Sequence, residues 1–184
     1  KFDPVNYLGL RLAPDMLPFT RQIQIATDGV KGCMARLAGL EVPKWEDNEA
    51  SLDELRARIR KARDYVQSFA AEQIDGSEGR EILLPTRQGE PLRFTGENYL
   101  KHYVLPNLYF HATTTYALLR HAGVEVGKRD FLLAWLTHLA AGVAFLGLRQ
   151  PRPLRVFYLQ AEVQYHYLRE RVKEIRLPPS RLGA

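Results

Sequence analysis

Cysteine is almost missing from this sequence of 184 residues, which contains a single one, Cys33. One cysteine cannot form a disulfide within the chain, so the fold does not need an oxidising compartment. No G-x-S-x-G, Walker or dinucleotide-binding motif occurs either, which leaves three large enzyme classes without support. No charged segment followed by an apolar run and a cleavage site opens the chain, so nothing indicates secretion. The cytoplasm is the compartment that these absences favour.

An excess of one charge is also missing from most of the chain. Residues 1–131 contain 18 basic and 18 acidic side chains, whereas residues 132–184 contain 8 and 3. The net charge of +5 therefore arises in the last part of the chain. A balanced first part without a basic stripe, zinc-finger spacing or aromatic–basic motif predicts no nucleic-acid partner.

Helical periodicity is what the sequence does contain. Apolar residues recur at spacings of three and four over residues 18–38 and 51–70, which predicts two amphipathic helices. A third helix is expected over residues 97–121, with a bend near Pro106. The segment 80–94 has two short extended runs around a glycine, which predicts a small β-hairpin at most. The fold class is therefore mainly α.

The second of these helices combines an apolar stripe with many basic side chains. Its expected N-cap is Ser51, and Glu54 completes a capping-box pattern. Because the basic residues alternate with Asp and Glu around the helix, we expect them on a solvated face. The predicted stripe is Leu52, Leu55, Ile59, Ala62, Val66 and Phe69, and the basic set is Arg56, Arg58, Arg60, Lys61 and Arg63.

The composition changes at Phe131, where a run of 18 residues without a formal charge begins. Residues 131–148 are just long enough to span a membrane, but His138 and the glycines within the run favour a buried helix over an anchor. We therefore expect a bundle domain over residues 1–131 and a helical extension over 132–184. Residues 131–148 are predicted to complete the bundle by packing against the stripe of Phe19, Ile23 and Val30, with an outer helix at 154–175.

Several long motifs occur in a characteristic order: "RLAPDMLPFTRQIQIATD", "LPTRQGEPLRFTGENYL" and "LPNLYFHATTTYALLRHAGVEVGKRDF". Over about residues 2–131 the sequence resembles the bacterial family DUF1993, a domain of unknown function related to the DinB/YfiT-like superfamily. The resemblance implies a DinB-like up-and-down four-helix bundle with a small β-hairpin insertion, and no assigned activity. Family members carry a long first helix before the segment equivalent to "LAPDM", and here only the loop after it is present.

DinB-like relatives commonly hold a divalent metal with three histidines, two of them spaced i, i+4 on one helix. By this resemblance His111 falls on one ligand position, Asn107 on a second, and Gln24 near the third. Neutral amides are weak donors for zinc or nickel. We therefore expect neither a bound metal nor a cofactor in this chain.

A polar constellation is expected in the bundle core, formed by Gln24, Tyr103, Asn107, His111 and Thr114. One interpretation of these residues is a hydrogen-bond network that fixes the register of the helices. The other is a small-molecule pocket between helices, in which His111 is the group suited to proton transfer near neutral pH. Cys33, on an apolar helix face, is expected to be a buried, inert thiol.

Two functions follow from this constellation. The first is a metal-free helical bundle that binds a small ligand or serves a purely structural role, with a homodimer as a further arrangement open to it. The second is a DinB-type enzyme, a metal- or thiol-dependent transferase or hydrolase that uses His111. The sequence leaves open whether the protein is an enzyme.

Overall fold

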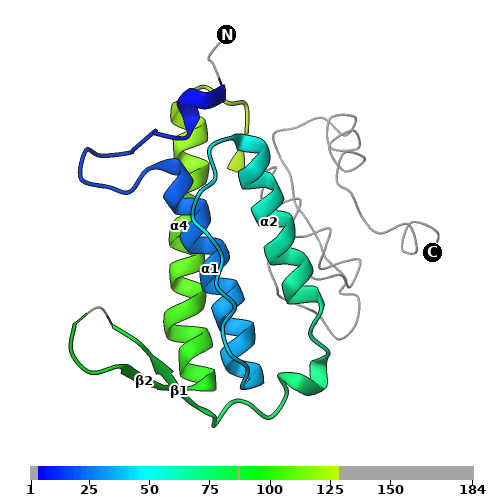
Figure 1. The fold of residues 1–184 in the computed structure, drawn as a ribbon. Coiled ribbons are helices and arrows are strands. Elements are labelled where there is room, and N and C mark those ends of the chain that lie inside the picture. Colours follow the sequence, from blue (N-terminus) through cyan, green and yellow to red (C-terminus); the bar gives the residue numbers. More distant parts are fainter. Residues whose placement is uncertain (1–3, 87, 129–184) are drawn as a thin grey trace, which may run out of the picture. The chain divides into compact units, whose positions relative to one another are not determined.

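A computed structural model of the chain describes residues 4–86 and 88–128. The chain divides into two units, residues 1–124 and residues 125–184, and the elements below lie in the first. Its elements confirm a mainly helical fold with one small hairpin (Figure 1). They are the 3₁₀-helix η1 (Pro4–Tyr7), α1 (Phe19–Ala38), α2 (Leu52–Gln67), the 3₁₀-helix η2 (Ala71–Gln73), β1 (Glu81–Leu84), β2 (Leu92–Thr95), α3 (Gly96–Asn98), the π-helix η3 (Tyr99–Val104) and α4 (Leu105–His121). The predicted helix 131–148 lies outside the described residues.

The start of α2 follows the predicted capping signal, and a glycine ends α1. Gly39 ends α1 in the left-handed conformation, with φ 72°, where the lack of a Cβ removes the steric penalty. Ser51 caps α2 by accepting a hydrogen bond of 3.2 Å from the amide of Glu54. The carboxylate of Glu54 reaches back to the amide of Ala50 at 2.6 Å. The capping pattern read from the sequence is thus present, with the return bond displaced by one residue.

Helices α1 and α2 run parallel to each other. Phe19 and Ile23, in the first turns of α1, form one buried cluster with Leu55, in the first turn of α2, and with Leu118, near the end of α4. The linker 39–51 runs back along α1 to the start of α2 (Figure 1). The expected up-and-down connection is therefore wrong for this pair, because the linker is long enough to cross the length of the helix.

The third predicted helix is a continuous helical run made of α3, η3 and α4. Thr95 caps it, with Oγ1 accepting from the amide of Asn98 at 3.4 Å. The π-helix ends at Val104, two residues before Pro106, near which the bend was predicted. Proline has no amide hydrogen for the i−4 bond, so a local change of helix type just before it is the expected response.

The hairpin covers the end of α1 that is distant from the Phe19 cluster. Ile82 pairs with Phe94 in the antiparallel ladder, and both pack in a second core cluster with Cys33 of α1 and with Tyr99 and Val104 of η3. The predicted hairpin is confirmed. It closes one end of the α1–α4 pair.

The predicted stripe of α2 is correct at Leu55 and Ala62 and wrong at Ile59. Leu55 and Ala62 are buried, but Ile59 is 47% exposed and Arg58 is only 4% exposed. The expectation that Arg58 lies on a solvated face is therefore wrong, because this side of α2 meets carboxylates of α1 and of the linker. Within residues 4–86 and 88–128, no helix is both long and apolar enough to cross a membrane.

Candidate functional site

His111, the candidate catalytic residue, is buried on α4 and is hydrogen-bonded to α1. Its Nδ1 lies 2.7 Å from Oε1 of Gln22, and Nε2 of Gln22 donates to the carbonyl oxygen of Leu17 at 2.8 Å. Because the amide nitrogen of Gln22 is used toward Leu17, its oxygen must accept, and Nδ1 of His111 must carry the proton. Burial lowers the pKa of His111, which favours the neutral ring. The free lone pair of the ring therefore lies on Nε2, which is the nitrogen through which His111 would accept a proton or bind a metal.

Gln24, the other expected partner on α1, is also buried but faces a different set of groups. Its Oε1 accepts a hydrogen bond of 2.7 Å from Arg21, and its Nε2 donates to Glu49 at 2.7 Å. Residues two apart on a helix differ by about 200° in direction. Gln22, and not Gln24, consequently contacts His111.

The remaining predicted site residues on η3 and α4 form hydrogen bonds or stacks of their own. Asn107 is exposed, and its Nδ2 donates to the carbonyl oxygen of Tyr103 at 2.7 Å. Thr114 is buried and donates to the carbonyl oxygen of Phe110 at 2.8 Å. The ring of Tyr103 stacks on that of Tyr99 with centroids 5.8 Å apart. The prediction of a single interior cluster is therefore wrong for Asn107. This residue lies at the surface, because a hydrogen bond to the i−4 carbonyl satisfies its side chain locally.

A metal has no evident ligand set in the described part of the chain. There, no three His, Cys, Asp or Glu side chains are arranged to hold an ion. The three positions that correspond to the DinB ligands do not meet, since Asn107 is exposed and Gln24 is bonded elsewhere. Cys33 is buried, and burial raises the pKa of its thiol to about 12, so the nucleophilic thiolate is rare near neutral pH.

A second polar cluster surrounds the buried side chain of Arg58. Its Nη1 donates to the carbonyl oxygen of Glu46 at 2.8 Å and to the carboxylate of Glu49 at 2.9 Å. Its Nη2 lies 3.0 Å from a carboxylate oxygen of Asp28 and 2.9 Å from one of Asp47, although the angles to both are poor for hydrogen bonds. The Arg58 cluster thus joins α2 to α1 and to the linker through one guanidinium.

Charge compensation keeps this cluster ionised. Burial by itself would lower the pKa of Arg58, but its bond to Glu49 and the nearby carboxylates outweigh burial and raise it. Burial would likewise raise the pKa values of Asp47 and Glu49. Hydrogen bonds from Arg21 to Asp47 and from Arg58 to Glu49 leave both carboxyl pKa values lowered.

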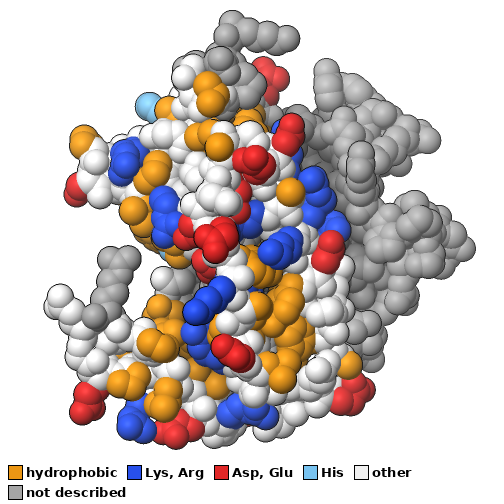
Figure 2. All heavy atoms as spheres, viewed as in Figure 1, with side chains coloured by type: hydrophobic (Ala, Val, Ile, Leu, Met, Phe, Trp, Pro, Cys, Tyr) orange, Lys and Arg blue, Asp and Glu red, His pale blue; other side chains and the backbone are white. Residues whose placement is uncertain are grey.

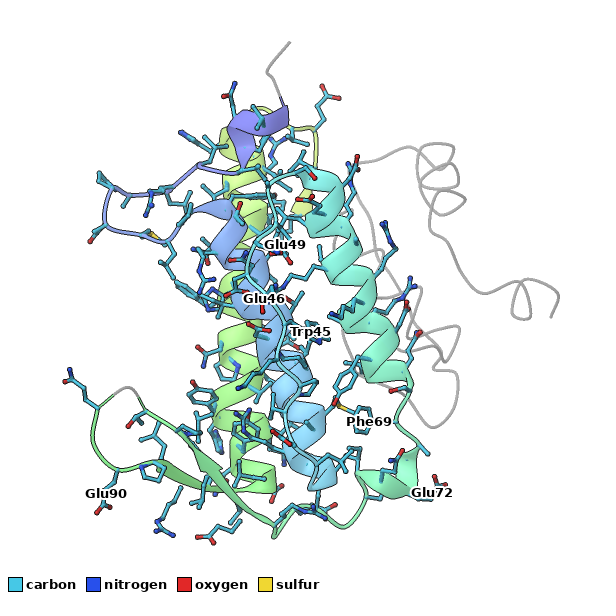
Figure 3. All side chains as sticks on the ribbon, viewed as in Figure 1. Trp45, Glu46, Glu49, Phe69, Glu72 and Glu90 are labelled. Atoms are coloured by element: carbon cyan, nitrogen blue, oxygen red, sulfur yellow. The ribbon has the colours of Figure 1, made fainter. Side chains whose placement is uncertain are left out.

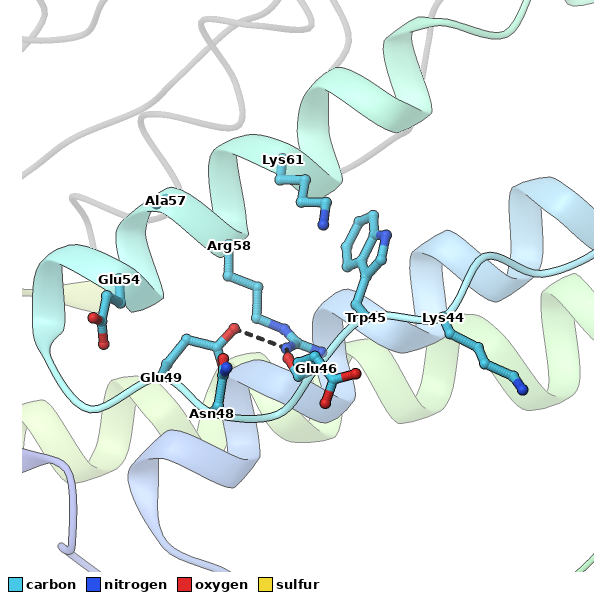
Figure 4. A pocket seen from close by; sticks show the side chains of 9 residues that line it. All are labelled: Lys44, Trp45, Glu46, Asn48, Glu49, Glu54, Ala57, Arg58 and Lys61. Atoms are coloured by element: carbon cyan, nitrogen blue, oxygen red, sulfur yellow. Dashed lines mark hydrogen bonds and ion pairs between the residues drawn. The ribbon is translucent and has the colours of Figure 1, made fainter.

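An open pocket of about 450 Å³ lies next to the Arg58 cluster, between the linker and α2 (Figure 4). Trp45 forms part of its wall, and Arg58 and Ala57 contribute from α2. Figure 3 shows that Trp45, Glu46 and Glu49 come from the linker, beside α1 and α2, and acidic and basic side chains are interleaved on this face (Figure 2). The full lining is Lys44, Trp45, Glu46, Asn48, Glu49, Glu54, Ala57, Arg58 and Lys61. We call it the Trp45 pocket.

The sequence carries a signal for the Arg58 cluster that the charge pattern obscured. Arg58 comes three residues after Leu55 and four before Ala62, which places it next to the buried stripe of α2. The linker before it contains the acidic run "WEDNE", from Trp45 to Glu49. A basic residue at a helix position that is expected to be buried, together with an acidic linker, indicates an internal ion pair.

Comparison with known proteins gives the family. A crystal structure of a DinB family member protein from Shewanella denitrificans is similar, with 42% sequence identity and a TM-score of 0.64. The similarity covers 71% of this chain and 73% of that one, and supports the relation to DinB proteins that the motifs implied. No curated protein matches the chain. Residues 1–132 match DUF1993, a domain of unknown function, and the chain therefore belongs to that family.

Proposed function

We propose that the protein is a metal-free, non-catalytic helical bundle that binds a small polar molecule in the Trp45 pocket. The observation that carries this proposal is the pocket itself, about 450 Å³ in volume, with a half-buried aromatic ring in its wall and a buried guanidinium beside it. Its lining is mainly charged, with Trp45 and Ala57 as the apolar members, which suits a small polar molecule better than an apolar one. The hydrogen bond of His111 to Gln22 serves instead to hold α4 against α1, and Thr114 is satisfied within its own helix.

Filling the pocket tests this proposal. Ala57 is an exposed residue of α2 that lines the pocket, so Ala57→Phe places a ring in the ligand's space without disturbing the core. Arg63→Phe on the exposed face of the same helix is the matched control. Ligand-observed NMR with a set of small amines, carboxylates and zwitterions should detect binding to the parent and to the control, but not to Ala57→Phe. No binding to the parent, or binding unaffected by Ala57→Phe, contradicts the proposal.

Absence of a resident metal is tested separately. Elemental analysis after dialysis against metal-free buffer is expected to find no stoichiometric zinc or nickel, because neither Asn107 nor Gln24 replaces a missing histidine ligand. About one ion per chain would overturn this part of the proposal.

We also propose that α1, α2 and α4 are three members of a four-helix bundle. Helix α1 contacts both other helices (Figure 1), and Phe19 and Ile23 are already covered by Leu55 and Leu118. Exposed apolar side chains occur instead on the two outer helices, where Ile59 is 47% and Phe110 is 54% exposed. Both outer helices therefore have apolar surface that a fourth helix would cover.

Residues 131–148 are our candidate for the fourth helix on sequence grounds alone, because they are uncharged and, at about 1.5 Å per residue, long enough. A chain truncated after Asp130 should then lose stability or self-associate, measured by urea denaturation and sedimentation. A truncated chain that stays folded and monomeric would contradict this assignment.

The alternative function is a DinB-type enzyme that uses His111. The observation in its favour is the tautomer that Gln22 imposes, with Nε2 of His111 free to accept a proton. Turnover of thiol or ester substrates, with or without added divalent metal, should then vanish in His111→Ala while circular dichroism stays unchanged. Turnover that persists in this variant would exclude His111 as the catalytic base.

A further inference from the structure

We infer that the Trp45 pocket is a site for a small aliphatic amine, and that the ammonium group of Lys61 holds the ligand's place when no ligand is bound. The inference rests on the proposed binding function and assigns the chemical class of the ligand.

The first support is the geometry around the indole ring. Nζ of Lys61 lies 4.5 Å from the ring centroid of Trp45, well within the range of cation–π attraction (Figure 4). Lys31 also approaches the ring, at 4.7 Å, but it is buried and ion-paired with Asp28 at 2.7 Å. Lys61 is exposed and has no ion pair among the described residues. Of the two ammonium groups at the ring, Lys61 is therefore the one that can leave at little cost.

The second support is the charge that Lys61 would leave behind. The lining contains the cations Lys44, Arg58 and Lys61 and the carboxylates Glu46, Glu49 and Glu54. Without Lys61, Glu49 remains paired with Arg58, and the charged groups of the lining that have no ion pair among the described residues are Glu46, Glu54 and Lys44, which sum to one negative charge. The vacated space thus carries a net negative charge and an aromatic face, which together favour a cation over an anion.

The third support is the fit of an alkyl ammonium. The exposed Ala57 leaves room along α2 for a short apolar chain, while the ammonium group would lie at the ring and donate to carboxylates on the rim. A carboxylate or phosphate in the vacated space would lie beside Glu46 and Glu54, with Lys44 as the one lining cation outside an ion pair among the described residues. The side chain of Lys61 is itself such an amine, so n-butylamine reproduces it without the backbone.

Fluorescence of Trp45 provides the test. The chain has two tryptophans, so Trp135→Phe isolates the signal of Trp45. Titration at neutral pH with n-butylamine, and with butyrate and butanol as probes of matched length, should show saturable binding of the amine alone. Lys61→Ala removes the internal competitor and should tighten the amine at least about fivefold, because the competent state is no longer partly occupied. Lys61→Arg should keep the competitor and the weaker affinity, and Lys101→Ala, at an exposed lysine outside the pocket, should change nothing.

Two further variants locate the site. Glu46→Gln removes a rim carboxylate and should weaken amine binding, and Trp45→Leu should abolish it in ligand-observed NMR. Equal affinity for butylamine and butanol, or an amine affinity unchanged in Lys61→Ala, overturns the inference. If butyrate or a zwitterion binds at Trp45 and the amine does not, the amine assignment fails while the proposed binding function stands. If no small molecule binds the parent, both fail.

Discussion

Nε of Arg58 donates a hydrogen bond of 2.8 Å to Oγ1 of Thr27, which joins α2 directly to α1. The hydroxyl of Thr27 in turn donates to the carbonyl oxygen of Ile23 at 2.9 Å. A buried cation of one helix is thus tied to the backbone of the other through a single side chain. The same guanidinium fixes the linker through Glu46 and Glu49, so one residue joins three segments.

Replacing Arg58 by Met should therefore destabilise the fold strongly. The variant leaves the carboxylates of Asp28, Asp47 and Glu49 without their shared cation. We expect the free energy of unfolding to fall by about 2–3 kcal/mol, below the full value for a buried pair because two of the carboxylates are about one-third exposed. Urea denaturation measures this change. Arg56→Ala, which removes an exposed pair with Asp53, should change stability by less than about 0.5 kcal/mol, and equal losses in the two variants would contradict the role of Arg58.

His111 should make the free energy of unfolding depend on pH, over a pH range higher than the one in which the carboxylates of the Arg58 cluster titrate. Because its pKa is lowered on folding, the unfolded chain binds the proton more readily, and stability is lost as pH falls from about 6.5 toward the folded pKa. Asp47 and Glu49, whose pKa values are also lowered, lose their contribution as pH falls further, below about 4.5.

Urea midpoints between pH 7 and pH 4 separate the two windows. His111→Gln should flatten the stability profile between about pH 6.5 and pH 4.5 and leave the loss at lower pH intact. His102→Gln, at an exposed histidine, is the matched control. A parent slope in the upper window that survives His111→Gln would show that another group titrates there.

Gly96 should not tolerate a side chain, for steric reasons. A Cβ at this position would lie 2.0 Å from the carbonyl oxygen of Ser77, a backbone atom that cannot simply rotate away. Gly96→Ala should cost about 1–3 kcal/mol in thermal or urea unfolding, as overpacking of a filled core does. Gly79→Ala meets nothing within 4 Å and should be within about 0.5 kcal/mol of the parent. Similar stabilities for both variants would show that the junction of hairpin and helix can open.

Cys33 should be unreactive while the protein is folded. Its thiol is buried in the cluster with Leu37 and Tyr99, and burial raises its pKa to about 12. A chromogenic disulfide reagent should therefore modify it orders of magnitude more slowly in buffer than in denaturant. Rapid modification in buffer would show that this end of α1 opens readily, or that the thiol has a chemical role.

Local signals in the sequence predicted the elements of this fold well. The periodicity of residues 18–38 and 51–70 and the capping pair Ser51 and Glu54 each act within one or two helical turns. The two extended runs around a glycine likewise predicted the hairpin over residues 80–94. These features depend on backbone geometry and on neighbours in sequence, so the sequence by itself determined them.

Packing decided the rest. Whether Gln22 or Gln24 meets His111 depends on the rotation of α1 against α4, and a shift of two residues turns a side chain through about 200°. Asn107 could reach the core or its own backbone, and the local bond to Tyr103 prevailed. The path of the linker along α1 brings its carboxylates to Arg58, which turns a residue expected in solvent into a buried cation and places Trp45 beside Lys61. The sequence determined which helices form, because helix formation depends on residues within one or two turns. The tertiary structure decided which of their polar side chains meet, because those side chains belong to segments that are far apart in sequence and come together only when the chain packs.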